Sequence, residues 1–408
     1  MAFLIGFCAG GARGAGNDWP QFLGPDRNGE YHGSELNDSW PRGGPAVLWH
    51  RDVGKGWAAP VVRDGRLLLF HRVGNTEKLE CLDALTGKQI WVADSATAYQ
   101  DDFGFDDGPR ATPTIAGDSI FTYGAEGALR CHAFSTGREI WAVDTKGRFN
   151  QNKGFFGMAC SPLVEGDALI VNIGAAGAGV VAFDRTTGKT LWKATDDEAG
   201  YSSPVATTIG GKRYILAFTR AGLNALDPAS GKIYFQYPYR SKMNASVNAA
   251  TPLVADDSVF LSASYETGAT LLRFHEGGPE KVWADDGVLS NHYSTSVIHA
   301  GILYGFDGRQ EEGQHLRCVE LKSGKVRWSQ DDFGAGTLIV ADGLSTAILV
   351  ILSEKGELVE AAASPDGFKQ LGKKQLVGFE TRANAAIANG LYFARGKTQL
   401  VCVDLRKP

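Results

Sequence analysis

The sequence lacks the features that mark several common protein classes. Its 408 residues include six cysteines, no two of them adjacent, and only three methionines. No apolar stretch reaches the ~18 residues that a membrane-spanning helix needs. The eight histidines form neither an HExxH motif nor another tight ligand pair, and neither a GxSxG elbow nor a Walker loop is present. The sequence therefore does not support a membrane span, a zinc site, a serine hydrolase or a nucleotide-binding P-loop.

Charge of one sign is not concentrated anywhere along the chain. The 41 basic and 46 acidic residues give a formal net charge of -5, and no basic run occurs. Because a nucleic-acid partner requires a basic patch or stripe, we expect none. The residue that is abundant is glycine, with 52 copies, which fits a chain with many tight turns.

An 11-residue pattern recurs along the chain. Each copy begins with a small apolar residue, has glycine in seventh place and ends in an aromatic residue. The clearest copies are "CLDALTGKQIW" (81–91), "CHAFSTGREIW" (131–141), "AFDRTTGKTLW" (182–192), "ALDPASGKIYF" (225–235) and "CVELKSGKVRW" (318–328). With weaker copies, the closing positions run from 49 to 371 in seven steps, a mean spacing of 46. A β repeat of that length is typical of propeller blades.

Turn signals count the repeats independently. In each repeat a two-residue turn separates two apolar runs, and Gly, Asn and Asp tolerate the positive φ that such turns require. The eight turns are Asp64-Gly65, Gly117-Asp118, Gly166-Asp167, Gly210-Gly211, Asp256-Asp257, Ala300-Gly301, Asp342-Gly343 and Asn389-Gly390. The strand before each turn begins with small residues and often a proline, and no helical periodicity is convincing. The sequence predicts an all-β fold, a single eight-bladed β-propeller of four-stranded antiparallel blades.

The ends of the chain predict how the ring closes. After residue 371 only 37 residues remain, too few for a whole blade. The missing outer strand is expected at "AVLWHRD" (46–52), beside "QLVCVDL" (399–405), because closure removes exposed sheet edges. Residues 46–408 are thus predicted to form the propeller, and residues 18–45 a segment that leads into it.

The first 17 residues are predicted to be a signal-peptide remnant or a flexible leader. "MAFLIGFCAGGARGAG" is apolar and then small, like the end of a secretory signal peptide, although a positive beginning is missing. We therefore expect an exported protein, periplasmic or extracellular. Cys8 raises a lipid anchor as an alternative, which Phe7 directly before it disfavours.

Four cysteines occupy the first position of the 11-residue pattern or its equivalent near the C-terminus. Other copies have alanine at this position. A position that accepts both is predicted to be a small buried slot in which the thiol is free. The cysteines are Cys81, Cys131, Cys318 and Cys402.

The pattern resembles the tryptophan-docking motif of the quinoprotein family, whose members are eight-bladed PQQ-like propellers. The resemblance covers roughly residues 45–408, and "WPQFLGPDRNG" (19–29) resembles the leading segment of secreted members. It implies either a non-catalytic scaffold related to outer-membrane assembly or a PQQ-dependent alcohol or sugar dehydrogenase. The dehydrogenases carry a vicinal Cys-Cys ring, calcium ligands from Glu, Asn and Asp, and a catalytic Asp. Because this chain has no adjacent cysteines, we expect no cofactor, with PQQ and calcium as the alternative.

Propellers usually bind ligands at one mouth of the central channel, where loops lead into the innermost strands. The residues at those positions combine positive charge, amides and aromatic rings, which suits a small anionic or sugar ligand. They are Trp57, Arg110, Met158, Tyr201, Asn248, His292, Phe333 and Arg382, with Asn244, Tyr293 and Asn384 close by. The binding residues proposed are Trp57, Arg110, Tyr201, Asn248, His292, Arg382 and Asn384. The competing interpretation is that any propeller mouth needs polar residues.

Two long connections could also carry chemistry. "YQDDFGFDDGPR" (99–110) holds four aspartates, but their spacing matches no EF-hand, so we expect a solvated acidic loop rather than a calcium site. In "GRFNQNKGFFGMAC" (147–160), Phe155 and Phe156 could cap the channel or contact a partner, and packing on the neighbouring blade is the favoured interpretation. The chain is thus expected to be a monomeric binding or scaffold module for a protein partner or a small ligand.

Overall fold

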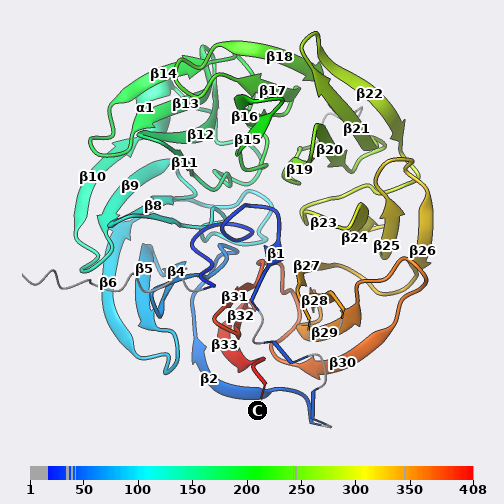
Figure 1. Cartoon of the computed structure of the whole chain (residues 1–408). Helices are drawn as coiled ribbons and strands as arrows, with labels where there is room; N and C mark the ends of the chain where they lie inside the picture. Colours follow the sequence, from blue (N-terminus) through cyan, green and yellow to red (C-terminus); the bar gives the residue numbers. More distant parts are fainter. Residues whose placement is uncertain are drawn as a thin grey trace, which may run out of the picture.

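The computed structural model describes residues 17–33, 36–37, 40–41, 43–241, 243, 246–343 and 346–407. Over these residues the strands form eight sheets arranged as blades around a central axis (Figure 1). The predicted all-β, eight-bladed propeller of four-stranded antiparallel blades is therefore confirmed. The leader predicted at residues 1–17, Cys8 included, lies outside the described residues apart from Asn17.

The first four blades follow one another along the chain. Blade 1 contains β3 (Val61–Arg63), β4 (Arg66–Val73), β5 (Thr76–Asp83) and β6 (Gln89–Ala96). Blade 2 contains β7 (Thr114–Ala116), β8 (Ser119–Tyr123), β9 (Ala128–Ala133) and β10 (Glu139–Asp144). Blade 3 contains β11 (Leu163–Glu165), β12 (Ala168–Ala175), β13 (Ala178–Asp184) and β14 (Thr190–Ala194). Blade 4 contains β15 (Val205–Ile209), β16 (Lys212–Phe218), β17 (Gly222–Leu226) and β18 (Ile233–Pro238).

The remaining blades complete the ring. Blade 5 contains β19 (Leu253–Ala255), β20 (Ser258–Ala263), β21 (Gly268–His275) and β22 (Gly278–Asp285). Blade 6 contains β23 (Val297–His299), β24 (Ile302–Arg309), β25 (Gly313–Glu320) and β26 (Val326–Gln330). Blade 7 contains β27 (Gly336–Ala341), β28 (Ile348–Ser353), β29 (Glu357–Ala362) and β30 (Gln370–Gln375), with β1 (Glu30–Tyr31) added beside β27. Blade 8 contains β31 (Ala386–Ala388), β32 (Leu391–Arg395), β33 (Gln399–Asp404) and β2 (Ala46–Asp52).

Blade 8 closes the ring as the sequence predicts. Strand β2 pairs antiparallel with β33, from Ala46 opposite Asp404 to Asp52 opposite Gln399. In Figure 1 the blue N-terminal strand lies beside the red C-terminal strand of the same blade. The two ends of the propeller are thereby joined by backbone hydrogen bonds, and β33 is covered by β2 on the side that faces away from β32.

The apolar core lies between neighbouring blades rather than in one central mass. Six successive residues of β4 are buried, which matches its continuous run "LLLF", because a strand covered on both faces has no polar side. Between blades 1 and 2, for example, Leu68 and Phe70 pack in one cluster with Ile120 and Phe134. Each blade therefore needs its neighbour to bury its faces.

The repeated glycine and tryptophan meet across several blade interfaces, among them Gly87 with Trp49 and Gly324 with Trp283. Gly231 of blade 4 lies against Trp192 of blade 3, where an added Cβ would come within 2.4 Å of Trp192 Cε3. The indole Nε1 of Trp192 donates to the carbonyl of Pro228 at 3.0 Å. The corresponding indoles that donate to the next blade are Trp49, Trp141, Trp283 and Trp328. The glycine of one copy is thus needed to accommodate the aromatic residue of the preceding copy.

The segment of residues 19–31, called the plug here, crosses the central channel. Trp19 exchanges backbone hydrogen bonds with Val62 of β3, and the carbonyl of Pro20 accepts from Ile115 of β7. At its other end Glu30 and Tyr31 pair with β27. The plug therefore joins blades that lie on different sides of the axis, near the centre of the ring in Figure 1.

Arg27 anchors the middle of the plug. Only 3% of this residue is exposed, and its guanidinium donates to the carbonyls of Ser161 and Pro162 at 2.9 and 3.0 Å. Burial lowers the pKa of Arg27 to about 10, which still leaves it charged at neutral pH. The sequence analysis did not single out this residue.

Two local expectations are wrong. Strand β27 ends at Ala341 and β28 begins at Ile348, so Asp342-Gly343 starts a longer connection than the two-residue turn predicted there. A short helix, α1 (Thr145–Phe149), follows β10 where no helix was expected; the Asp144 side chain caps it by accepting from the Gly147 N–H. Among the described residues no helix has the length and apolar character that crossing a bilayer requires.

The cysteine prediction is confirmed for the described residues. Cys81, Cys131, Cys318 and Cys402 are buried and form no disulfide, and the same holds for Cys160. Burial raises the pKa of the Cys81 and Cys160 thiols to about 11, so these groups stay protonated.

Candidate functional site

A cavity of about 230 Å³ opens at one mouth of the channel. Residues of seven connections line it, and each connection leads into the innermost strand of its blade, as expected for a propeller mouth. Phe22 of the plug also lines the cavity. Because the plug pairs with the innermost strands themselves, deeper than the mouth residues that precede them, Phe22 forms the floor.

The structure brings most of the predicted residues to this cavity. The residues that line it are Trp57, Arg110, Tyr201, His292, Tyr293, Arg382 and Asn384. Asn248 does not reach it, because its amide donates to the carbonyls of Thr219 and Tyr239 at 2.8 and 2.9 Å and its side chain is buried. Met158 and Phe333 pack into the apolar core between blades. Asn244 lies outside the described residues.

Two arginines share one tryptophan at the cavity wall. The Cζ atoms of Arg110 and Arg382 lie 4.9 and 5.2 Å from the Trp57 ring centroid, within the range of cation–π attraction. Arg110 faces the buried carboxylate of Asp101 at 3.6 Å, and Arg382 donates through Nε to Glu354 at 2.8 Å. Within the described part of the chain, the terminal guanidinium nitrogens of Arg382 donate no hydrogen bond to protein. Arg382 is therefore the cation that remains able to pair with an anion in the cavity.

Neutral groups face these arginines. His292 Nε2 lies 2.9 Å from the Tyr265 hydroxyl, and burial lowers the pKa of His292 below its usual value of 6.5. Burial also raises the pKa of Tyr201 to about 12, and its hydroxyl accepts from the Phe156 N–H at 2.8 Å. At neutral pH these residues are uncharged. They can donate and accept hydrogen bonds without being prepared as a charged base or nucleophile.

Several lining residues were missed by the sequence analysis. Phe22 comes from the plug, and Tyr265, Gln310 and Glu311 come from hairpin tips, where no repeat signal distinguishes them. From the sequence, three further lining residues are noted only for their small size, although each carries a hydroxyl group. They directly precede the prolines of the innermost strands, and that position could have identified them: Thr112, Ser161 and Ser203.

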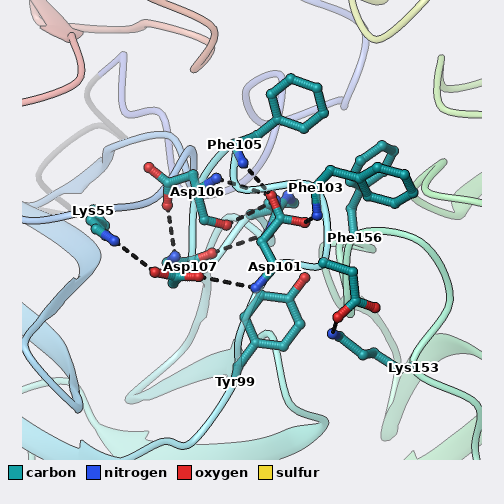
Figure 2. A network of polar contacts seen from close by, with 12 residues as sticks. Lys55, Tyr99, Asp101, Phe103, Phe105, Asp106, Asp107, Lys153 and Phe156 are labelled. Carbon is teal, nitrogen blue, oxygen red and sulfur yellow. Dashed lines mark hydrogen bonds and ion pairs between the residues drawn. The ribbon is translucent and has the colours of Figure 1, made fainter.

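The acidic connection is not the solvated loop that the sequence suggested. Figure 2 shows the carboxylates of Asp101, Asp106 and Asp107 turned onto the loop's own backbone. Asp101 accepts from the N–H groups of Phe105 and Asp106 at 2.7 and 3.1 Å, and Asp107 accepts from the Asp101 N–H at 3.0 Å. Asp101 and Asp106 are buried. Because backbone N–H groups satisfy these oxygens, the aspartates fix the shape of the loop that carries Phe105 to the cavity, and Lys55 pairs with Asp107 at 2.6 Å.

The second long connection supplies one wall of the mouth. Phe156 lines the cavity and packs on Tyr201 of the next blade, with ring centroids 5.8 Å apart. The favoured packing on a neighbouring blade is thus confirmed for Phe156, which also faces the channel. Lys153 pairs with Asp102 at 2.6 Å, which joins the two long connections (Figure 2). Phe155 lies beside Phe156, with ring centroids 6.4 Å apart and ring planes tilted by 50°.

The residues at the mouth do not fit a quinone cofactor with its calcium ion. Among the described residues that line the cavity, Glu311 supplies the single carboxylate. No group of three or more His, Cys, Asp or Glu residues in the described part of the chain could hold a metal. Calcium takes 6–8 oxygen ligands, and no adjacent cysteines are present to form a ring beside the cofactor.

Known proteins resemble this chain in sequence and in fold. The outer membrane protein assembly factor BamB of Burkholderia pseudomallei (strain K96243) is 25% identical over 290 residues, which cover 68% of this chain and 70% of that protein. Two crystal structures share the fold. BamB from Moraxella catarrhalis has a TM-score of 0.63 and 14% identity, over 88% of this chain and 97% of that chain. Quinohemoprotein alcohol dehydrogenase from Comamonas testosteroni has a TM-score of 0.68 and 13% identity, over 96% of this chain and 81% of that chain.

A family model matches the central part of the chain. Residues 75–330 match the family model described as outer membrane protein assembly factor BamB, which is more than half of the chain. This match agrees with the PQQ-like resemblance carried by the 11-residue pattern. The chain belongs to the family of PQQ-like propellers described as outer membrane protein assembly factor BamB.

Proposed function

We propose that this chain is an exported, non-catalytic binding propeller that acts as a monomeric scaffold and holds a small polar ligand at its channel mouth. The observation that carries the proposal is the cavity beside Trp57, in which the terminal nitrogens of Arg382 remain free to donate to a ligand. The family description supports a scaffold, since its members are assembly factors. The leader-like first residues support export.

The chemistry of the cavity supports binding over turnover. Its histidine and tyrosines are neutral at pH 7, and its arginines are held by Asp101 and Glu354. Volume also matters, because about 230 Å³ is below the ~300–1,000 Å³ typical of sites for drug-sized ligands. The ligand of such a site is small, or enters with one end only.

A thermal-shift panel of metabolites and glycans on the full chain tests the proposal. A ligand of the mouth should raise the Tm, and Arg382→Ala should reduce that shift. Arg273→Ala serves as a matched control, since Arg273 is exposed on blade 5 and pairs only with Asp257 at 3.7 Å. If no member of the panel shifts the Tm, or if both variants lose the shift equally, the proposed ligand site at the mouth is wrong.

A PQQ-dependent dehydrogenase is the second candidate, favoured by the fold shared with the quinohemoprotein. It is tested by adding PQQ and Ca²⁺, then primary alcohols and aldoses with an artificial electron acceptor. We expect no turnover. If turnover occurs and is lost in Glu311→Gln, the protein is an enzyme and the proposed non-catalytic function is wrong.

A further inference from the structure

Three buried hydroxyls form an arc along the cavity wall. The Ala59 N–H donates to Thr112 Oγ1 at 3.0 Å, the Thr112 N–H donates to Ser161 Oγ at 2.9 Å, and the Ser161 N–H donates to Ser203 Oγ at 3.0 Å. Each hydroxyl therefore accepts from the blade before it. Between 1% and 3% of these three residues is exposed, and all three line the cavity.

Among the described residues, this arrangement leaves the O–H donor of each hydroxyl, together with one lone pair, without a protein partner. Each oxygen already accepts a backbone N–H, and within the described residues none of the three hydroxyls donates to a protein acceptor. A hydroxyl carries one proton to donate besides its lone pairs. The arc, defined as Thr112, Ser161 and Ser203, therefore offers one O–H from each of three successive blades. A ligand with several oxygen acceptors would satisfy them, whereas an apolar ligand would leave them unpaired.

The remainder of the wall adds a cation and flat apolar surface. Arg382 has free terminal nitrogens, which can form a charge-assisted pair with a carboxylate. The rings of Trp57, Tyr201 and Phe156 are flat apolar surfaces on which the C–H groups of a sugar-ring face can pack. Asn384 supplies an amide that can both donate and accept.

We propose that the cavity binds an acidic sugar: a pyranose with one carboxylate, whose hydroxyl and ring oxygens accept from the arc while the carboxylate pairs with Arg382. This assignment rests on the proposed ligand site and adds its chemical class. A neutral sugar would leave the terminal nitrogens of Arg382 without an anionic partner, and a carboxylic acid without hydroxyls would leave the arc unpaired. The same chemistry could come from a free monosaccharide or from the end of an acidic polysaccharide.

Isothermal titration of the full chain tests the ligand class. The probes are glucuronate, glucose, which lacks the carboxylate, and cyclohexanecarboxylate, which lacks the hydroxyls. We expect glucuronate to bind at least about tenfold more tightly than either analogue, because a site built for hydrogen bonds rejects a ligand that lacks them. An oligosaccharide ending in glucuronate separates the two sources. Tighter binding than glucuronate indicates a polysaccharide end, and weaker binding indicates the free sugar.

Two substitutions test which side chains distinguish glucuronate from its two analogues. Arg382→Gln should remove the preference for glucuronate over glucose while glucose binding is kept. Thr112→Ala should remove the preference over cyclohexanecarboxylate. Its control is Thr295→Ala, because Thr295 Oγ1 accepts the Thr251 N–H at 3.0 Å in the same way and is buried, but it does not line the cavity. The control should lose stability to a similar extent and keep the preference.

The outcomes separate this assignment from the proposed function. If a ligand binds and Trp57→Ala abolishes binding, but glucuronate shows no preference over both analogues, the acidic-sugar assignment is wrong and the binding site stands. Equal loss of preference in Thr112→Ala and Thr295→Ala also overturns the role of the arc. If no probe and no member of the wider panel binds, both proposals fail.

Discussion

At the outer rim, indoles from five blades donate the same hydrogen bond to the following blade, whereas the channel mouth presents different side chains from blade to blade. Trp57, Arg110, Tyr201 and His292 occupy comparable places before their innermost strands. The rim is repetitive because each blade must solve the same packing problem. The mouth is free of that requirement, so its side chains can differ from blade to blade.

Removing the chain before Gly54 tests the closure of the ring and should have the largest effect. This truncation deletes β2 and the plug together, which leaves β33 as an open edge and the channel without Arg27. We expect the Tm to fall by at least about 10 °C, with aggregation through the exposed edge. Thermal unfolding and size-exclusion chromatography measure both. A chain beginning at Asn17 is the control, and full stability of the shorter chain would refute closure by β2.

Substituting one of the repeated glycines at the rim tests whether its contact with a tryptophan stabilises the fold. Gly231→Ala places a Cβ 2.4 Å from Trp192 at a φ of +70°, so we expect a loss of about 2–4 kcal/mol in the free energy of unfolding. Gly65→Ala is the matched control, since its φ is +69° and no atom lies within 4 Å of the added Cβ. It should cost about 1–2 kcal/mol. Equal losses in denaturant titrations would contradict the role of the tryptophan contact.

Glu77 tests a buried position whose residue varies between copies, where the equivalents include Gly127, Ala178, Ala221, Gln314 and Glu357. Burial raises the pKa of Glu77 to about 7, although its carboxylate accepts the Ala125 N–H at 3.0 Å. The folded state therefore holds a proton that the unfolded state has released, and stability falls as the pH rises from about 4.5 through 7. We expect a decrease of roughly 1–3 kcal/mol from this group.

The variant Glu77→Gln should remove that pH dependence while keeping an oxygen to accept the Ala125 N–H. Urea titrations of both proteins at pH 5 and pH 8 measure it. An unchanged pH profile in the variant would show that other groups cause the decrease.

The smallest effect is expected at the first position of the 11-residue pattern. Cys402→Ala should cost about 1 kcal/mol or less, because Ala182 and Ala361 fill the same slot with 0% exposure. Cys402→Leu should cost more, since extra methylenes overpack a closed site. Denaturant titration compares the two variants, and a large loss in the alanine variant would mean that this slot differs from its repeats.

The repeats explain which parts of the structure could be predicted. The number of strands, the ring closure and the rim contacts depend on a pattern that recurs several times in the sequence. A single copy that departs from the pattern therefore does not obscure them. The buried thiols followed from comparing Cys81 with Ala182 at one position of the pattern. The connection after Asp342 was wrongly predicted because a Gly-containing dipeptide resembles a turn whether or not the strands meet there.

The remaining parts depend on contacts across the axis, which no local pattern encodes. Arg27 bonds to carbonyls 134 and 135 residues away, and Phe22 meets residues of most blades only because the ring closes. The inward aspartates were misread because composition alone suggests solvation, whereas Asp101 finds N–H partners within its own loop. Of the predicted residues that precede an innermost strand, Trp57, Arg110, Tyr201, His292 and Arg382 line the cavity, whereas Met158, Asn248 and Phe333 do not.

The plug has a consequence for the order of folding. The carbonyl of Asn17 accepts from Asn389 of blade 8, and the Tyr31 hydroxyl accepts from Gly390, so residues more than 350 positions apart in the sequence are bonded to each other. Contacts of such sequence separation form slowly. The plug therefore makes all of its contacts only when blade 8 is in place. Ligand binding at the mouth should accordingly report the arrival of the last blade.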